Sequence, residues 1–143
     1  MHVQSNQASA ITKLWISSTS LTKKVDLSFG AIHGIAFTEY LVLQHLMSAT
    51  NKVARRIDLA ESMQRSASAI TKMLTPMEKI GLIEKQVNPR DARESLVKIT
   101  EAGEKVFIDA SDTLNQRSKV LLQRLESDHL NNLVEVLNIL NET

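Results

Sequence analysis

The stretch that constrains the fold most runs from residue 56 to residue 100, where two helical patterns are followed by a hairpin pattern. The first helical pattern is short and ends in a turn at Gln64 and Arg65. Ser66 then stands where a hydroxyl can cap a second helix by accepting a backbone N–H, and Gly81 stands where a glycine commonly ends one. Apolar residues at helical spacing give that helix one buried face: Ala67, Ile70, Met73, Leu74, Met77 and Ile80.

The opposite face of the second helix is polar, with small hydroxyl groups near its start and cations further along: Ser68, Lys72, Thr75 and Lys79. This face has no large side chain that would block its approach to a groove. After the helix, the β-prone segments 82–87 and 95–99 flank a polar turn with Asn88 and Pro89, which indicates a hairpin. Helix, turn, helix and hairpin in this order predict a winged helix-turn-helix, a fold whose second helix enters the major groove of DNA.

The same stretch resembles the DNA-binding core of the multiple antibiotic resistance regulator (MarR) family of bacterial transcription factors. The matching segments are spread along it: Leu59–Ala60, Ser66–Thr71, Leu74, Met77–Ile83, Asp91–Arg93 and Leu96–Gly103. Each segment alone is weak evidence, whereas their combination in this order is specific. The 143 residues suit a whole family member, so we expect the resemblance to extend over nearly all of the chain.

Composition favours helices over a β-sandwich. Hydrophobic side chains make up 43% of the chain, enough for one domain with its own core, while only 3% of the residues are aromatic and glycine and proline are scarce. The absence of cysteine excludes a thiol redox switch, a disulfide and a thiolate metal site. The apolar runs are far shorter than the ~20 residues that span a membrane, and the N-terminus lacks a signal-peptide pattern. We therefore expect a cytoplasmic protein without a membrane partner.

Charge is distributed unevenly along the chain. Residues 51–100 contain ten basic and six acidic side chains, whereas the rest of the chain contains seven basic and ten acidic ones. A basic middle between mildly acidic ends is typical of a DNA-reading module. The same excess of positive charge is also ordinary for a protein surface, so the charge by itself leaves both interpretations open.

The segments on either side of this region carry further helical patterns. Residues 7–25 are predicted to form a helix with one apolar stripe. The next segment, 26–34, contains two glycines and is the predicted break. The pattern that begins near residue 101 continues for about six turns. Three further helices have a hydroxyl or carboxylate side chain placed to cap them: Thr38, Thr100 and either Ser127 or Asp128.

The terminal helices have more apolar surface than a small winged helix can cover. This predicts a homodimer. The alternative is that these helices pack on one another within one chain, as a separate satellite bundle. The resemblance implies dimerisation through these N- and C-terminal segments. We therefore expect one domain over residues 1–143 with a mainly α fold and a small β wing. Residues 7–34 and 101–143 would form the dimerisation bundle, and residues 35–100 the winged helix-turn-helix. A two-fold dimer would read two half-sites about one helical turn apart.

The predicted DNA contacts on the second helix and just before it are Arg65, Ser66, Ser68, Thr71 and Lys72. The free N–H groups and the dipole at a helix N-terminus favour a phosphate near Ser66 and Arg65. A plain capping role for Ser66 is at least as well founded, and both roles can coexist. Lys72 also suits a solvated face.

The predicted contacts in the hairpin are Arg90, Asp91 and Arg93. The resemblance implies that Arg93 enters the minor groove, where an arginine reads groove width, and that Asp91 orients it. Ala92 stands where the family usually has arginine, so we expect Arg90 to take over that phosphate contact. A simple charged hairpin tip is the alternative. In the preceding helix, Pro76 removes one backbone hydrogen bond, which predicts a bend.

The resemblance also implies a small-molecule effector, often aromatic or anionic, that binds between the dimer bundle and the DNA-binding region. The aromatic and histidine side chains near that junction are the candidates, although each suits the core better: Trp15, Phe29, His33, Phe37 and Tyr40. The four histidines form no metal-binding pair, and neither a nucleotide-binding glycine loop nor a nucleophile elbow is present. We expect no enzyme activity, no cofactor and no metal.

These patterns predict a dimer that binds specific sequences in double-stranded DNA. The resemblance further implies that this homodimer is a repressor, which a small molecule releases from a pseudo-palindromic operator. The alternative is a winged-helix module that binds proteins and has no specific DNA binding. Cations at both groove-reaching positions, Lys72 and Arg93, favour the first interpretation.

Overall fold

Helices dominate the computed structural model, which describes residues 2–142. The described chain forms six α-helices and a three-stranded antiparallel sheet with the strand order β1-β3-β2, which confirms the mainly α winged-helix class. The elements are α1 (Asn6–His33), α2 (Phe37–Ser48), β1 (Val53–Arg55), α3 (Arg56–Ser62), α4 (Ala67–Lys79), β2 (Ile83–Asn88), β3 (Asp91–Ile99), α5 (Glu101–Leu121) and α6 (Ser127–Asn141). Among the helices of residues 2–142, none combines the length and apolarity that a membrane span requires.

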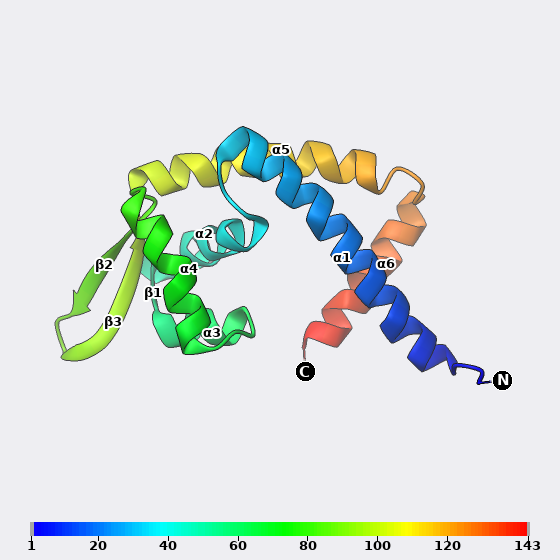
Figure 1. The fold of residues 1–143 in the computed structure, drawn as a ribbon, viewed down its shortest axis with the longest axis horizontal. Helices are drawn as coiled ribbons and strands as arrows, with labels where there is room; N and C mark the ends of the chain where they lie inside the picture. The colour runs from blue at the N-terminus through cyan, green and yellow to red at the C-terminus, as the bar shows by residue number, and fades with distance from the viewer. Residues whose placement is uncertain (1, 143) are drawn as a thin grey trace.

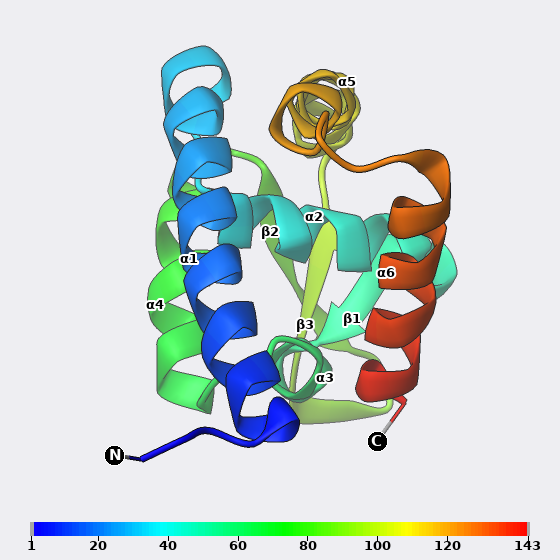
Figure 2. The same ribbon diagram turned by 90° about the vertical axis from the view of Figure 1, so that its right-hand side faces the viewer.

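The molecule has two parts that the long helix α5 connects (Figure 1). Helices α2, α3 and α4 and the sheet gather beneath one end of α5, while α1 and α6 extend below the other end. These two terminal helices overlap in Figure 1, but Figure 2 separates them as two columns on opposite sides of the molecule. The compact part therefore contains the predicted winged helix, while α6 and the N-terminal part of α1 lie outside it.

The core lies where α2, α3 and α4 pack against the sheet and against α1. Its largest fully buried side chains come from all of these elements: Phe29, Val42, Leu43, Leu46, Leu59, Ile70, Leu74, Met77 and Val97. In α4 the buried positions recur at helical spacing, so burying this face turns the polar face outward. Gly81 follows α4 with φ +82, the left-handed conformation predicted for the glycine after this helix.

Helix α1 is longer than predicted. The break expected over residues 26–34 occurs only at the last residue of that segment, and the rest of this prediction is wrong. The helix continues through Gly30 to His33, and Gly34 then ends it in the left-handed conformation with φ 68. Val25 and Phe29 are both buried on the same face of α1. Burial of these side chains outweighs the low helix propensity of one glycine, which costs about 1 kcal/mol.

Two of the predicted N-caps are misplaced by one or two residues. The residue that precedes α2 is Ala36 rather than Thr38, because two carboxylates satisfy the free N–H groups there: Glu39 accepts from Ala36 at 2.8 Å and Asp26 from Phe37 at 2.6 Å. Helix α6 begins after Glu126, one residue before the predicted position.

The other two caps are confirmed. The Thr100 hydroxyl accepts the N–H of Gly103 at 3.0 Å, and the Ser66 hydroxyl accepts the N–H of Ala69 at 3.1 Å. Both hydroxyls satisfy backbone donors that the first turn of a helix leaves without a partner. The starts of α4 and α5 are therefore encoded locally.

Strand β1 was not expected from the sequence pattern. Its three residues pair antiparallel with β3, with Val53 opposite Lys98 and Arg55 opposite Leu96. Asn51 and Lys52 precede it with positive φ values of 58 and 59. The pairing brings the beginning of α3 next to the strand that forms one side of the wing.

Candidate nucleic-acid interface

The N-terminal end of α4 and the tip of the β2–β3 hairpin lie at the same end of the molecule, the lower end in Figure 1. All five residues predicted to contact DNA at this helix are exposed: Arg65, Ser66, Ser68, Thr71 and Lys72. On the other side of α4, Ile70, Leu74 and Met77 have exposed fractions of 0%. The structure therefore brings the predicted helix residues together on one accessible, polar surface.

The hydroxyl groups of α4 differ in how far they are already engaged. Thr71 donates through Oγ1 to the carbonyl of Ala67 at 3.1 Å, and Thr75 donates to the carbonyl of Thr71 at 2.8 Å. The hydroxyls of Ser66 and Ser68 lie 3.4 Å apart. No ion pair joins Lys72 to any of the described residues. Lys72 and Ser68 are therefore the groups on this face best able to bind outward.

Pro76 lies inside α4, which continues for three residues beyond it. Its side chain is on the exposed side of the helix. The hydroxyl of Thr75 caps the neighbouring carbonyl of Thr71, a bond within the same turn that also bends helices. The bend at Pro76 stays a prediction.

The wing holds its predicted residues on an exposed tip. Asp91 accepts the backbone N–H of Arg93 through Oδ1 at 3.0 Å, and Asn88 accepts that of Arg90 through Oδ1 at 2.9 Å. Asn88 also donates through Nδ2 to Glu94 at 2.6 Å. The hydrogen bond that Asp91 accepts thus holds the backbone of Arg93 in place. The guanidinium groups of Arg90 and Arg93 form no ion pair within residues 2–142.

A polar network that sequence reasoning missed connects α3 to the wing. Arg55 donates to both carboxylate oxygens of Asp58, at 3.0 and 2.9 Å, and its Nε lies 3.3 Å from Glu94 of β3. Arg56 donates through Nε to the Ser95 hydroxyl at 2.8 Å. The sequence signal for this network was a pair of consecutive arginines followed by Asp58, three residues after Arg55. The partners of these arginines on β3, however, lie about forty residues away along the chain.

The electrostatics of this network are dominated by one pair. The hydrogen bonds from Arg55 lower the pKa of the Asp58 carboxyl, and the same interaction raises the pKa of the Arg55 guanidinium. Because the Asp58 pKa is lowered on folding, the pair stabilises the fold above the ordinary carboxyl pKa and loses that effect as the pH falls through the folded value. Both side chains are substantially exposed, so solvent keeps the contribution small.

Four of the five candidate effector residues gather where α1, α2 and α5 meet. The ring of Phe29 lies 5.3 Å from that of Tyr40 and 5.9 Å from those of His33 and Phe37, and Tyr40 stacks on Phe107 at 5.2 Å. Phe29 and Tyr40 are buried, with exposed fractions of 0% and 3%. These rings therefore fill part of the core, in line with the alternative considered for them.

The polar ends of this cluster are bound within the protein. Tyr40 shares a hydrogen bond of 2.9 Å with Ser111, and His33 one of 2.7 Å with Thr113. Trp15, the fifth candidate, does not join the cluster. It is 68% exposed and precedes Phe29 by fourteen residues of the same helix, a separation of about 21 Å along the helix axis.

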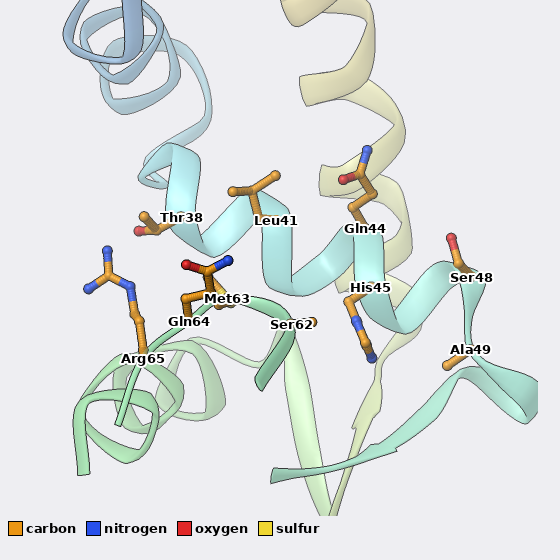
Figure 3. A pocket seen from close by; sticks show the side chains of 10 residues that line it. All are labelled: Thr38, Leu41, Gln44, His45, Ser48, Ala49, Ser62, Met63, Gln64 and Arg65. Atoms are coloured by element: carbon orange, nitrogen blue, oxygen red, sulfur yellow. The ribbon is translucent and has the colours of Figure 1, made fainter. Parts of the chain in front are cut away.

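An open hollow of about 740 Å³ lies between α2 and the turn that joins α3 to α4. Figure 3 shows Arg65 reaching from this turn toward Thr38 of α2. His45 and Met63 also line the hollow, and none of the five candidate effector residues does. Gln64, in the turn, has a positive φ of 52. Among the described residues, no cluster of His, Asp and Glu side chains could hold a metal ion.

Comparison with family models gives one match, which lies in the compact part of the molecule. Residues 38–95 match the family model described as MarR family. No match to a curated protein was found. Solved structures with the same fold are numerous, and three of them are described next.

Sco3205 of Streptomyces coelicolor, a MarR family transcriptional regulator solved in complex with DNA, has a TM-score of 0.85 and 19% identity over 99% of this chain and 90% of its own. The transcriptional regulator BldR of Sulfolobus solfataricus has a TM-score of 0.88 and 21% identity, with both chains covered fully. A MarR/EmrR family regulator of Acinetobacter sp. ADP1 has a TM-score of 0.80 and 22% identity over 97% of this chain and 96% of its own. At these identities the likeness establishes the fold.

Proposed function

We propose, on the premise that this chain is a protein of the MarR family, that it is a sequence-specific DNA-binding transcription regulator. The observation that carries the proposal is the outward polar face of α4, where Ser68 and Lys72 lie opposite the buried residues Ile70, Leu74 and Met77. A helix of this kind can enter the major groove without losing its packing on the protein. Sco3205, which shares the fold, was solved in complex with DNA, and this supports the same role here.

The start of α4 and the wing would bind DNA in different ways. Ser68 and Lys72 would contact base edges in the major groove, where a lysine suits the acceptors of guanine. Ser66 and Arg65 would contact phosphate beside the helix N-terminus, and Thr71 would contribute mainly its methyl group, since its hydroxyl already donates to the backbone.

Arg93 of the wing would enter the adjacent minor groove and read its width. Asp91 would support this contact through its bond to the Arg93 backbone, and Arg90 would hold a phosphate in place of the arginine that the family usually has at position 92. The exposed tip supports this assignment, as does the absence of an ion pair from either guanidinium to any described residue.

The regulator would act as a homodimer through residues 7–34 and 101–143, with residues 35–100 as the DNA-binding region. Support comes from α6, in which no described residue is buried although apolar side chains cover much of its circumference. The side chains of α1, α5 and α6 also border an apolar hollow of about 680 Å³, which supports a second copy over a satellite bundle within one chain. A second copy would cover these surfaces and place two copies of α4 on two half-sites.

We further propose that the dimer represses transcription in the cytoplasm and that a small molecule releases it from the operator. The hollow between α2 and the α3–α4 turn offers space for such a molecule, whereas the packed cluster of Phe29, Phe37 and Tyr40 offers little. Arg65 and His45 in that hollow suit an anionic group on the ligand.

The decisive experiment is to select bound fragments from the host genome and to measure affinity for the selected duplex between 50 and 200 mM salt. Neutralising ~6–10 phosphates predicts a loss of ~10³–10⁵ in affinity over this range. If the protein does not bind DNA, or if its affinity does not depend on salt, the alternative of a protein-interaction module is favoured.

Lys72→Ala tests the reading role of α4 in the same assay. We expect it to weaken binding to the selected duplex by about 1–3 kcal/mol, because a base contact is lost. Lys79→Ala is the matched control, since it removes the same charge from the far end of the helix and should have a smaller effect. An equal loss on random DNA would assign Lys72 to phosphate instead.

A further inference from the structure

Two consecutive arginines stand at the start of α3, and their surroundings differ. The charge of Arg55 is balanced by Asp58, with two hydrogen bonds, and by the nearby carboxylate of Glu94. Arg56 has no acidic partner among the described residues. Its hydrogen bonds go to neutral hydroxyl groups, at 2.8 Å to Ser95 and 3.5 Å to Thr71. Arg56 therefore keeps its full positive charge available.

The two hydroxyl partners place the Arg56 guanidinium between the predicted DNA-reading elements. Thr71 belongs to α4, and Ser95 belongs to β3 of the wing. The Thr71 hydroxyl gives its proton to Ala67, so it faces Arg56 as an acceptor. A guanidinium has five N–H donors, and these two contacts use two of them, which leaves three free.

A helix in the major groove and a wing in the adjacent minor groove are separated by one sugar-phosphate backbone. A cation that lies between the two elements must therefore face the backbone that runs between them. Phosphate oxygens accept the parallel N–H groups of a guanidinium particularly well. We infer that Arg56 is a phosphate-binding residue that clamps the DNA backbone between α4 and the wing, an assignment that rests on the proposed function.

The hydroxyl contacts also prepare Arg56 for this role. Ser95 and Thr71 hold the side chain in place before DNA arrives, so less side-chain freedom is lost on binding than for an arginine free in solvent. The same contacts bridge α4 and β3 and help to set the distance between the groove-reading elements. Arg56 thus has two roles: its charge faces the DNA, and its hydrogen bonds link α4 to β3 within the protein.

The test is the salt dependence of duplex binding by the full-length chain and by Arg56→Gln, which keeps a polar side chain and removes the charge. Each phosphate contact contributes about 0.9 to the slope of log affinity against log salt, so a dimer is expected to lose about 1.8. Over a fourfold rise in salt, the variant should lose about 12-fold less affinity than the wild type.

Two controls separate charge from structure. Lys119→Gln removes the same charge from an exposed position on α5, away from α4 and the wing. Once sedimentation equilibrium shows that this variant is a dimer, it should leave the slope unchanged. Ser95→Ala removes the shorter of the two contacts that hold Arg56 and keeps the Arg56 charge, so it should lower affinity without changing the slope. If Arg56→Gln also lowered affinity with an unchanged slope, Arg56 would only link α4 to β3 and the inference would be overturned.

A second measurement tests the contact first with the wild-type protein, so its main result does not depend on how well a variant folds. A neutral methylphosphonate is placed in turn at each phosphate between the bases contacted by the helix and those contacted by the wing. The wild type should lose affinity at one such position, and Arg56→Lys should lose less at that position because lysine lacks the paired donors. A wild type that is indifferent at every position would reject the assignment.

The outcomes distinguish the two proposals. A wild-type protein that binds the selected duplex with a steep salt slope, together with an Arg56→Gln variant that keeps this slope, rejects the role of Arg56 alone. A wild-type protein that shows no salt-dependent binding to any duplex rejects the regulator function and, with it, the inference.

Discussion

At the scale of single residues, Gly103 is the glycine at which an added Cβ would meet close neighbours. It is buried in the first turn of α5, and a Cβ there would collide with the carbonyl oxygen of Leu82 and lie 2.8 Å from Cγ1 of Ile99. Since the first neighbour is backbone, it cannot rotate away. We expect Gly103→Ala to lower the free energy of unfolding by about 1–3 kcal/mol, measured by chemical denaturation.

Gly30 provides the matched control for this substitution. It lies inside α1, and nothing stands within 4 Å of where its Cβ would be. Gly30→Ala should therefore raise stability by about 0.5–1 kcal/mol, because alanine loses less conformational freedom in a helix. Equal stability of the two variants would contradict the close approach of α5 to Leu82.

At the scale of elements, α4 depends on Ser66 for its start. The hydroxyl caps the N–H of Ala69, so Ser66→Ala should cost about 1 kcal/mol of stability. Ser66→Asp should keep the cap, since aspartate is an equally good one, and adds a negative charge where a phosphate is proposed to bind. We expect this variant to be as stable as the wild type and to bind the selected duplex at least tenfold more weakly, on the order of 1.4 kcal/mol.

The two substitutions at Ser66 separate its roles. Thermal unfolding reports the cap, and duplex affinity reports the approach of phosphate. Unchanged DNA affinity of Ser66→Asp would leave Ser66 with the capping role alone. The same reasoning applies to the whole element, because α4 can present a reading face only while its start is held and its apolar side is buried.

At the scale of the whole molecule, the terminal helices leave apolar surface exposed. Val136 and Ile139 of α6 have exposed fractions of 52% and 59%, on a helix with no buried residue among those described. If a second copy covers this surface, Val136→Glu should shift the protein from dimer to monomer in sedimentation equilibrium. Operator affinity should fall with it, because a monomer reads only one half-site.

Asn138→Glu is the control for this prediction. It introduces the same charge on the polar side of α6, two residues away, and should leave the dimer intact. The far-UV circular dichroism of both variants should match that of the wild type, since the core around Leu43 and Leu74 is elsewhere. A Val136→Glu variant that remains dimeric would place the subunit contact on another surface.

Much of the DNA-binding region could be predicted from the sequence because its signals are local. The cap at Ser66, the end of α4 at Gly81 and the two-sided character of the helix each depend on residues within a few positions of one another. The hairpin was also predictable, since its strands are joined by a short turn. The contacts of these residues with DNA stay predictions.

The amino-acid sequence by itself determined the order of the helices and the wing, because capping, turn formation and apolar periodicity act over a few residues. Only the tertiary structure decided features that join distant segments. Three features depend on such contacts: the pairing of β1 with β3, the continuation of α1 through Gly30, and the position of Trp15 away from the Phe29 cluster. So do the different partners of Arg55 and Arg56, whose charges are alike in sequence and become distinct only when β3 packs beside α3.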